Sequence, residues 1–150
     1  MEDLQIQYNR SYKELDIIYH RYAASCGLSD SAFWLLYYIA DQSTKYTQRE
    51  ICADWSVSPQ TINTALKQLE QKQIVTLKAV GTNRKNKVIS LTSKGIKLVS
   101  KTIQPVLEAE QNAFASLKES EQKQLLKLTQ KQIALLRESM NQISSTSSED

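Results

Sequence analysis

The fold of this 150-residue chain is decided by residues 47–95, which read TQREICADWSVSPQTINTALKQLEQKQIVTLKAVGTNRKNKVISLTSKG. The first part of this stretch predicts two short helices separated by a tight turn. Thr47 can cap the first helix, and Glu50, three residues on, completes a capping box. Ser58 can cap the second helix, and Pro59 suits its first position because the N–H that proline lacks has no partner there.

The second of these helices has one apolar face and one polar face. Ile62, Leu66 and Leu69 recur at steps of four and three, which predicts a buried face. The polar face carries hydroxyls, amides and one lysine, with no acid before Glu70. It comprises Gln60, Thr61, Asn63, Thr64, Lys67, Gln68 and Gln71. A face of this composition suits the reading of base edges in DNA.

The rest of the stretch predicts two strands and a further helix. Ile74–Val80 and Val88–Leu91 show the alternation of short strands, and residues 81–87 between them form a predicted turn-rich tip with three positive charges. Thr92 can cap the helix that follows. This order is that of a winged helix-turn-helix, in which one helix enters the major groove of DNA and the hairpin lies beside it.

Apolar spacing predicts further buried faces in the N-terminal half. One face of a long first helix consists of Leu4, Tyr8, Tyr12, Leu15, Tyr19 and Tyr22. Gly27 is a stop signal for that helix. A second helix, capped by Ser29 or Asp30, contains the run FWLLYYIA, which is apolar on nearly every side and is therefore expected to be central. In the helix after Thr47, Ile51 and Ala53 are predicted to face inward.

The C-terminal third is also predicted to be helical. Pro105 is expected to kink a helix that runs to about residue 117. The last helix carries a heptad-like stripe of Leu126, Ile133 and Met140, joined by Leu136 and Ile143. This stripe can pair with a second copy or pack on its own domain. The polar tail over residues 144–150 is predicted to be disordered.

Composition supports a mainly α fold with a small antiparallel β-hairpin wing, since the chain has only three Gly and two Pro. No apolar run approaches the roughly 20 residues of a membrane span, and the acidic N-terminus is unlike a signal peptide. We therefore expect a cytoplasmic protein. Two cysteines and one histidine give no disulfide framework and no zinc spacing. We expect no metal, no cofactor and no enzymatic activity, because nucleophile and phosphate-binding motifs are absent from the sequence.

The positive charge is concentrated in the middle of the chain. Residues 44–101 contain eleven basic and three acidic side chains, a net charge of +8, whereas the whole chain carries +3. The segments on either side are both mildly acidic. A basic segment that coincides with a helix-turn-helix pattern predicts binding to a polyanion, although a solvated lysine-rich face would have the same composition.

These motifs resemble the MarR family of bacterial transcriptional regulators over about residues 4–143. The resemblance rests on residues 28–40, 58–75 and 83–95, which read LSDSAFWLLYYIA, SPQTINTALKQLEQKQIV and NRKNKVISLTSKG. Three positions depart from the family pattern. Asn83 stands where the wing usually has aspartate, Lys85 where it has arginine, and Gln73 where glycine is common.

The resemblance implies one MarR-like domain over residues 1–150, built as a winged helix-turn-helix with N- and C-terminal dimerisation helices. The DNA-binding lobe would span about residues 28–100, and the dimerisation lobe about 4–26 and 101–143. The protein would be a homodimeric repressor that binds a pseudo-palindromic double-stranded operator and is released by a small aromatic ligand. Its DNA-binding residues would be Ser58, Gln60, Thr61, Asn63, Thr64, Lys67, Asn83, Arg84, Lys85 and Lys87.

Members of the family respond to small ligands or to cysteine oxidation. The residues implied for a ligand pocket are Tyr12, Tyr19, His20, Tyr22, Trp34 and Tyr38, although such rings also suit a core or a dimer interface. Cys26 and Cys52 are the candidates for redox sensing; packing is the simpler account of Cys52. A winged-helix protein-interaction scaffold without operator recognition remains an alternative function.

Overall fold

The structure is a computed structural model that describes residues 3–41, 45–55 and 58–146, with the side chains of residues 83–85 and 145–146 outside the description. The chain divides into two compact units, Met1–Val106 and Leu107–Asp150. Within the described part of the chain, no helix has both the length and the apolar character needed to cross a bilayer.

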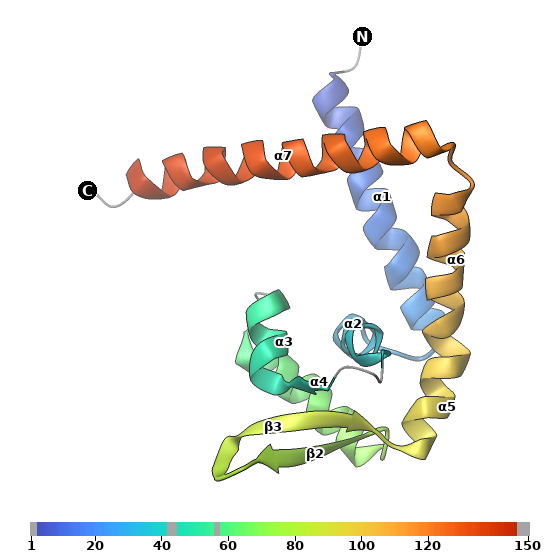
Figure 1. Ribbon diagram of the computed structural model, residues 1–150, viewed down its shortest axis with the longest axis vertical. Helices are drawn as coiled ribbons and strands as arrows, with labels where there is room; N and C mark the ends of the chain where they lie inside the picture. The colour runs from blue at the N-terminus through green and yellow to red at the C-terminus, as the bar shows by residue number, and fades with distance from the viewer. Residues whose placement is uncertain (1–2, 42–44, 56–57, 147–150) are drawn as a thin grey trace. The chain divides into compact units, whose positions relative to one another are not determined.

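The described elements are mostly helices, with one small sheet (Figure 1). They are α1 (Leu4–Ser25), α2 (Asp30–Ile39), β1 (Tyr46–Thr47), α3 (Gln48–Trp55), α4 (Pro59–Gln71), β2 (Val75–Val80), β3 (Asn83–Leu91), α5 (Ser93–Thr102), α6 (Gln104–Ala115) and α7 (Glu119–Thr146). This order confirms the mainly α fold with a hairpin wing. The helix α7 extends to Thr146, so residues 144–146 of the predicted tail are helical; residues 147–150 lie outside the description.

The expected helix starts are confirmed by their capping bonds. The Ser29, Ser58 and Thr92 side chains accept hydrogen bonds from the amides three residues on, which begins α2, α4 and α5. Thr47 and Glu50 form the predicted capping box, in which the Thr47 amide donates to Oε2 of Glu50 over 2.7 Å. The Glu50 amide in turn donates to the Thr47 hydroxyl. Local sequence alone therefore sets where these helices begin.

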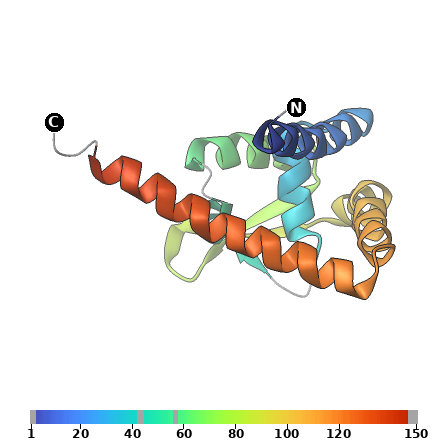
Figure 2. The same ribbon diagram turned by 90° about the horizontal axis from the view of Figure 1, so that it is seen from above.

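The core of the first unit is centred on α2, as the apolar run predicted (Figure 1). Phe33, Leu35 and Leu36 are completely buried, and each contributes roughly 1.5–3 kcal/mol through burial. The predicted apolar face of α4 is buried too, with Ile62 and Leu66 at its centre. The helix α1 crosses α2, so that the rings of Tyr19 and Tyr22 pack on Phe33 (Figure 2).

One predicted inward residue of α3 is exposed. Ile51 is completely buried, but Ala53 faces solvent, so that prediction was wrong. Side chains two positions apart in an α-helix, such as those of Ile51 and Ala53, point about 200° apart around the helix axis. They therefore cannot share a narrow buried face. Cys52 and Trp55 are half-buried instead.

The sheet contains a strand that the sequence analysis missed. Its order is β1-β3-β2, all antiparallel, with Tyr46 opposite Ile89 and Thr47 opposite Val88. The predicted tip over residues 81–87 was also too long, because β3 begins at Asn83 and only Gly81 and Thr82 form the turn. A register shift between Ala79 and Val80 accompanies the longer strand. Polar residues on an exposed two-stranded ribbon show no alternation, so the pattern did not reveal the strand.

The base of the wing is fixed by a close backbone contact between β2 and α5. A Cβ at Gly95 would lie 2.0 Å from the carbonyl oxygen of Ile74. Thr92 reinforces the contact, since its amide donates to Ile74 O and its hydroxyl donates to Gln73 O. Gln73 has a φ of 59°, the left-handed conformation for which glycine is usual. Gln73 therefore adopts the conformation that a glycine at this position would favour.

The predicted kink at Pro105 is a complete break between two helices. The helix α5 ends at Thr102 and α6 starts at Gln104, because Pro105 has no N–H for the helical ladder. The amide of Val106 donates to Ile103 O rather than to Thr102 O. The Tyr22 hydroxyl donates to Thr102 O over 2.8 Å, so a side chain of α1 uses that carbonyl.

Candidate nucleic-acid interface

The exposed side of α4 is a narrow ridge of polar residues. Gln60, Thr64, Lys67 and Gln71 follow one another at steps of four, three and four, opposite the buried face, and all four are exposed. Thr64 donates its hydroxyl hydrogen to Gln60 O, which leaves its oxygen lone pairs as acceptors. The ridge therefore presents amide donors and acceptors, a hydroxyl and one cation.

Two other predicted contact residues lie on opposite flanks of this ridge. Asn63 faces α3 and the wing, while Thr61 lies on the side of α2. Ser58 is exposed but already serves as the cap of α4, and its hydroxyl also lies 2.9 Å from that of Thr61. The structure thus brings Gln60, Thr64 and Lys67 together on one surface.

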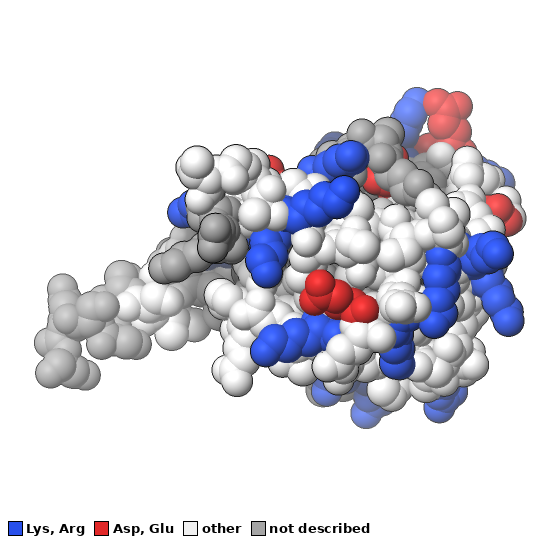
Figure 3. Space-filling model, turned by 90° about the horizontal axis from the view of Figure 1, so that it is seen from below, with Lys and Arg blue, Asp and Glu red and all other residues white. Residues whose placement is uncertain are grey.

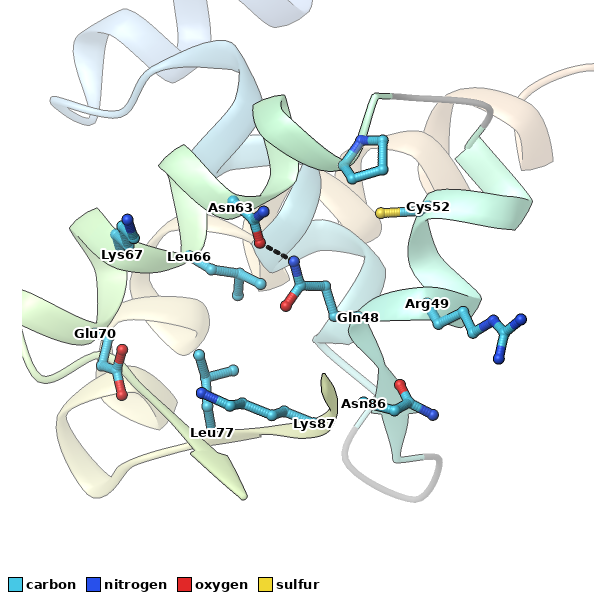
Figure 4. A pocket seen from close by; sticks show the side chains of 11 residues that line it. Gln48, Arg49, Cys52, Asn63, Leu66, Lys67, Glu70, Leu77, Asn86 and Lys87 are labelled. Atoms are coloured by element: carbon cyan, nitrogen blue, oxygen red, sulfur yellow. Dashed lines mark hydrogen bonds between the residues drawn. The ribbon is translucent and has the colours of Figure 1, made fainter. Parts of the chain in front are cut away.

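Asn63 is held by a residue that the sequence analysis did not select. Nε2 of Gln48, in the first turn of α3, donates a hydrogen bond to Oδ1 of Asn63 (Figure 4). The sequence offered little indication of this role, since it shows only that Gln48 follows the capping residue Thr47. The pairing depends on how α3 and α4 cross, which no local pattern encodes.

A cavity of about 720 Å³ lies between α3, α4 and the wing (Figure 4). Cys52, Leu66 and Leu77 supply apolar surface to it, and Arg49, Lys67 and Lys87 supply positive charge. Glu70 is the acidic residue of the lining. Asn86 is also part of the lining, and its buried Oδ1 has no hydrogen-bond partner within the described structure.

The wing and its surroundings carry the expected basic side chains. Lys87 is exposed on β3, whereas the side chains of Asn83, Arg84 and Lys85 lie outside the described residues. Within the described part of residues 45–101, the exposed basic residues are Lys45, Arg49, Lys67, Lys72, Lys78, Lys87, Lys94, Lys97 and Lys101. Figure 3 shows basic side chains spread over the face that carries the wing, with few acidic ones among them.

The residues predicted for a ligand pocket fall into separate groups. Tyr19 and Trp34 pack in a tilted arrangement at 4.9 Å between ring centroids, and Tyr22 packs edge-on against buried Phe33 in the same cluster. Tyr12 is 60% exposed and lies near Tyr8 instead. His20 Nδ1 is 2.9 Å from both carboxylate oxygens of Asp30. The structure therefore does not bring all six residues to one site.

Tyr38, the sixth of these residues, ties α2 to α3. Its hydroxyl donates a hydrogen bond to Asp54, and its ring packs against Tyr46 and Trp55. The bond to Asp54, followed by burial, raises the pKa of Tyr38 to about 12. Tyr38 therefore stays protonated and positions α3.

The two cysteines lie in different surroundings. Burial raises the pKa of the Cys52 thiol, which disfavours the reactive thiolate. Cys26, the C-cap residue of α1, is half-buried beside Tyr22. Burial, followed by the hydrogen bond to Cys26, raises the pKa of Tyr22.

Residues 27–85, which include α2, the helix-turn-helix and most of the wing, match the sequence profile of the MarR family. The winged-helix region of this chain is therefore similar in sequence to the MarR family. This agrees with the resemblance seen in the sequence. No significant match was found among curated proteins.

Solved MarR structures share the fold over nearly the whole chain. NMB1585, a MarR family regulator from Neisseria meningitidis, is 17% identical and has a TM-score of 0.77, with 94% of this chain and 99% of that chain covered. MepR of S. aureus in complex with DNA is 23% identical, with coverages of 91% and 99% and a TM-score of 0.72. MarR from Oenococcus oeni is 19% identical, with coverages of 88% and 99% and a TM-score of 0.67.

Proposed function

We propose that this protein is a sequence-specific regulator of transcription that binds double-stranded DNA as a homodimer on a pseudo-palindromic operator. The observation that carries the proposal is the exposed ridge of α4, which offers base-reading groups and has exposed basic residues around it. The DNA complex of MepR, a protein of the same fold, supports the choice of partner. Such a regulator would act in the cytoplasm and would not be an enzyme.

Each part of the interface has a role in this proposal. Gln60, Thr64 and Lys67 would contact base edges in the major groove, and Thr61 and Asn63 the flanking bases. Ser58 at the start of α4 would approach a phosphate. In the wing, Asn83, Arg84, Lys85 and Lys87 would bind the minor groove or neighbouring phosphates. The basic residues would make the affinity strongly dependent on salt.

In a homodimer, the second chain would bring a second α4 to the other half-site of the operator. The first helix α1 exposes large apolar side chains, namely Leu4, Ile6, Tyr8, Tyr12, Leu15, Ile17 and Ile18. The last helix α7 exposes Leu125, Leu126, Leu128, Ile133, Leu135, Leu136, Met140 and Ile143. Runs of this kind favour burial against a partner chain. We assign residues 28–100 to DNA binding, and residues 4–26 with 101–143 to dimerisation, as parts of a single domain over residues 1–150.

We further infer repression that a small ligand relieves. Among the proteins of the same fold, MepR is a transcription regulator of a multidrug efflux pump. The aromatic cluster of Tyr19, Tyr22 and Trp34 is the candidate ligand surface from the sequence, with Tyr12, His20 and Tyr38 further from it. Redox control through Cys52 is the less favoured mechanism because of its raised pKa.

Selection from a randomised pool of DNA duplexes, at about 150 mM salt, tests the proposal. We expect a two-fold-symmetric site whose half-sites are about one helical turn apart. Weak binding without enrichment, lost as salt rises, would reject operator recognition and favour a protein-interaction scaffold.

A further inference from the structure

A second cavity in the first unit lies on the α2 side of the helix-turn-helix, and its volume is about 310 Å³. Three helices line it with six residues, which are Asp30, Ser31, Trp34, Trp55, Thr61 and Ile62. The volume is at the lower end of the range for small-molecule sites, so the cavity suits a compact molecule.

Two indole rings form much of the apolar wall. Trp34 and Trp55 are the only tryptophans in the chain, and both are half-buried. Trp34 is held by Tyr19 and by Phe33, whose ring centroids lie 4.9 and 5.1 Å away. Trp55 is held by Tyr38 at 5.8 Å. Because neighbouring rings fix both indoles, this wall is formed before any ligand arrives.

The charge of the lining residues favours a positively charged ligand over a negatively charged one. Asp30 carries the one ionisable side chain among the six lining residues, and none of the six is basic. Its carboxylate lies 2.9 Å from His20 Nδ1, and since a carboxylate only accepts, that nitrogen carries the hydrogen. The carboxylate can accept further hydrogen bonds and is half exposed. The cavity beside the wing differs in this respect, because Arg49, Lys67 and Lys87 line it.

We propose that the cavity between Trp34, Trp55 and Asp30 binds a small organic cation with an apolar body, such as a quaternary ammonium compound. The faces of the indole rings attract a cation, and the Asp30 carboxylate supplies the opposite charge. The hydroxyls of Ser31 and Thr61 add hydrogen-bonding groups at the edge of the cavity. An anion of equal size would be repelled by the Asp30 carboxylate and would find no basic side chain in the lining.

The ligand would contact the start of α4 directly. Thr61 and Ile62 lie in the first turn of α4, and Thr61 is bonded to the cap Ser58 through both its amide and its hydroxyl. Every group that forms this binding site lies within one chain, so ligand binding requires neither DNA nor a second copy. The proposal is thus independent of the proposed DNA-binding function. It can therefore be tested without DNA.

The test is a titration of the wild-type protein in which binding is monitored by tryptophan fluorescence, because Trp34 and Trp55 both line the cavity. The probes are benzyltrimethylammonium, its uncharged carbon analogue neopentylbenzene and the anion phenylacetate. We expect a saturable signal with benzyltrimethylammonium and at least tenfold weaker binding of the other two. Equal binding of neopentylbenzene or phenylacetate, or a change that grows linearly without saturation, would overturn the proposal.

Two carboxylate variants locate the site. Asp30→Asn should weaken benzyltrimethylammonium binding about tenfold, whereas Asp16→Asn, a matched change at an exposed carboxylate of α1, should leave it unchanged. Equal affinities in the two variants would place the cation elsewhere and reject the site. Because Asp30→Asn also alters the contact with His20, circular dichroism should verify its fold, and the comparison of probes on the wild-type protein stands without any variant.

Discussion

Gln48 Nε2 donates a hydrogen bond to Asn63 Oδ1, which joins the start of α3 to the flank of α4 that faces the wing. This bond takes up one of the two lone pairs of the Asn63 oxygen and leaves both amide hydrogens as donors. An asparagine that reads adenine uses its oxygen and its amide together, so in the proposed DNA complex Asn63 would favour bases that offer acceptors. Gln48 would then act as a positioning residue for base reading.

Replacing Gln48 should therefore change sequence preference more than affinity. In Gln48→Ala, Asn63 recovers its free oxygen, and we expect a shift toward adenine at one position of each half-site, with the best affinity within about tenfold, or 1.4 kcal/mol. Selection of DNA sites with the variant checks this. The control is Gln111→Ala, at an exposed position of α6 outside the proposed DNA-binding residues, which should keep the wild-type preference. An unchanged preference in Gln48→Ala would contradict the role.

The wing lysine should act through the DNA backbone. Lys87→Ala should weaken binding to all sequences alike and should reduce the slope of log affinity against log salt by about 1. The measurement is fluorescence anisotropy of one duplex over a series of salt concentrations. Lys131→Ala, an exposed lysine on α7, is the matched control and should keep the wild-type slope. A loss confined to one DNA sequence would instead indicate a base contact.

Gly95 should tolerate no side chain. The added methyl group of Gly95→Ala would lie 2.0 Å from a backbone oxygen, which cannot rotate away as a side chain can. We expect a loss of about 1–3 kcal/mol in the free energy of unfolding, because overpacking exceeds the gain in helix propensity. Urea denaturation measures it. Ser100→Ala, at an exposed position of the same helix, should stay within about 0.5 kcal/mol of wild type.

Cys52 should react slowly in the folded protein. Since burial raises the pKa of its thiol, the thiolate fraction at pH 8 is lower than in an unfolded chain. In a Cys26→Ser background, iodoacetamide should modify Cys52 more slowly without urea than with it, and the native rate should rise with pH beyond pH 8. Mass spectrometry follows the reaction. Native modification at the unfolded rate would reopen redox sensing at this residue.

The apolar stripe of α7 should be needed for association. Leu136 is 52% exposed, and Leu136→Glu would place a charge where the proposed partner chain packs, which is strongly unfavourable without a counter-charge. We expect at least a tenfold weaker dimer by sedimentation equilibrium. Gln124→Glu adds the same charge about 120° around the helix axis from Leu136, outside the stripe, and should leave the dimer intact. Equal sedimentation of both variants would move the interface away from this stripe.

The features that could be predicted are those encoded within a few residues. The caps at Thr47, Ser58 and Thr92 follow from hydroxyl side chains just before helical sequence, and the buried face around Ile62 follows from its spacing. The central position of α2 follows from an unbroken apolar run. Each of these needs only local chemistry and helical periodicity.

The features that were missed depend on contacts between distant segments. Tyr46 and Thr47 form a strand only because β3 lies beside them, and two residues are too few to show alternation. The bond from Gln48 to Asn63 likewise requires the crossing of two helices. The aromatic residues were grouped by type, whereas the turns of α1 and α2 direct Tyr12 and Tyr38 to different places from Tyr19.

The exposed apolar residues of α7 also bear on how the stability of this protein must be expressed. If the stripe is buried only by a second chain, unfolding and dissociation are one equilibrium, and the midpoint temperature rises with protein concentration. A melting temperature would then have a meaning only together with the protein concentration at which it was measured. In a cell, the number of copies present would set how much of the protein is folded.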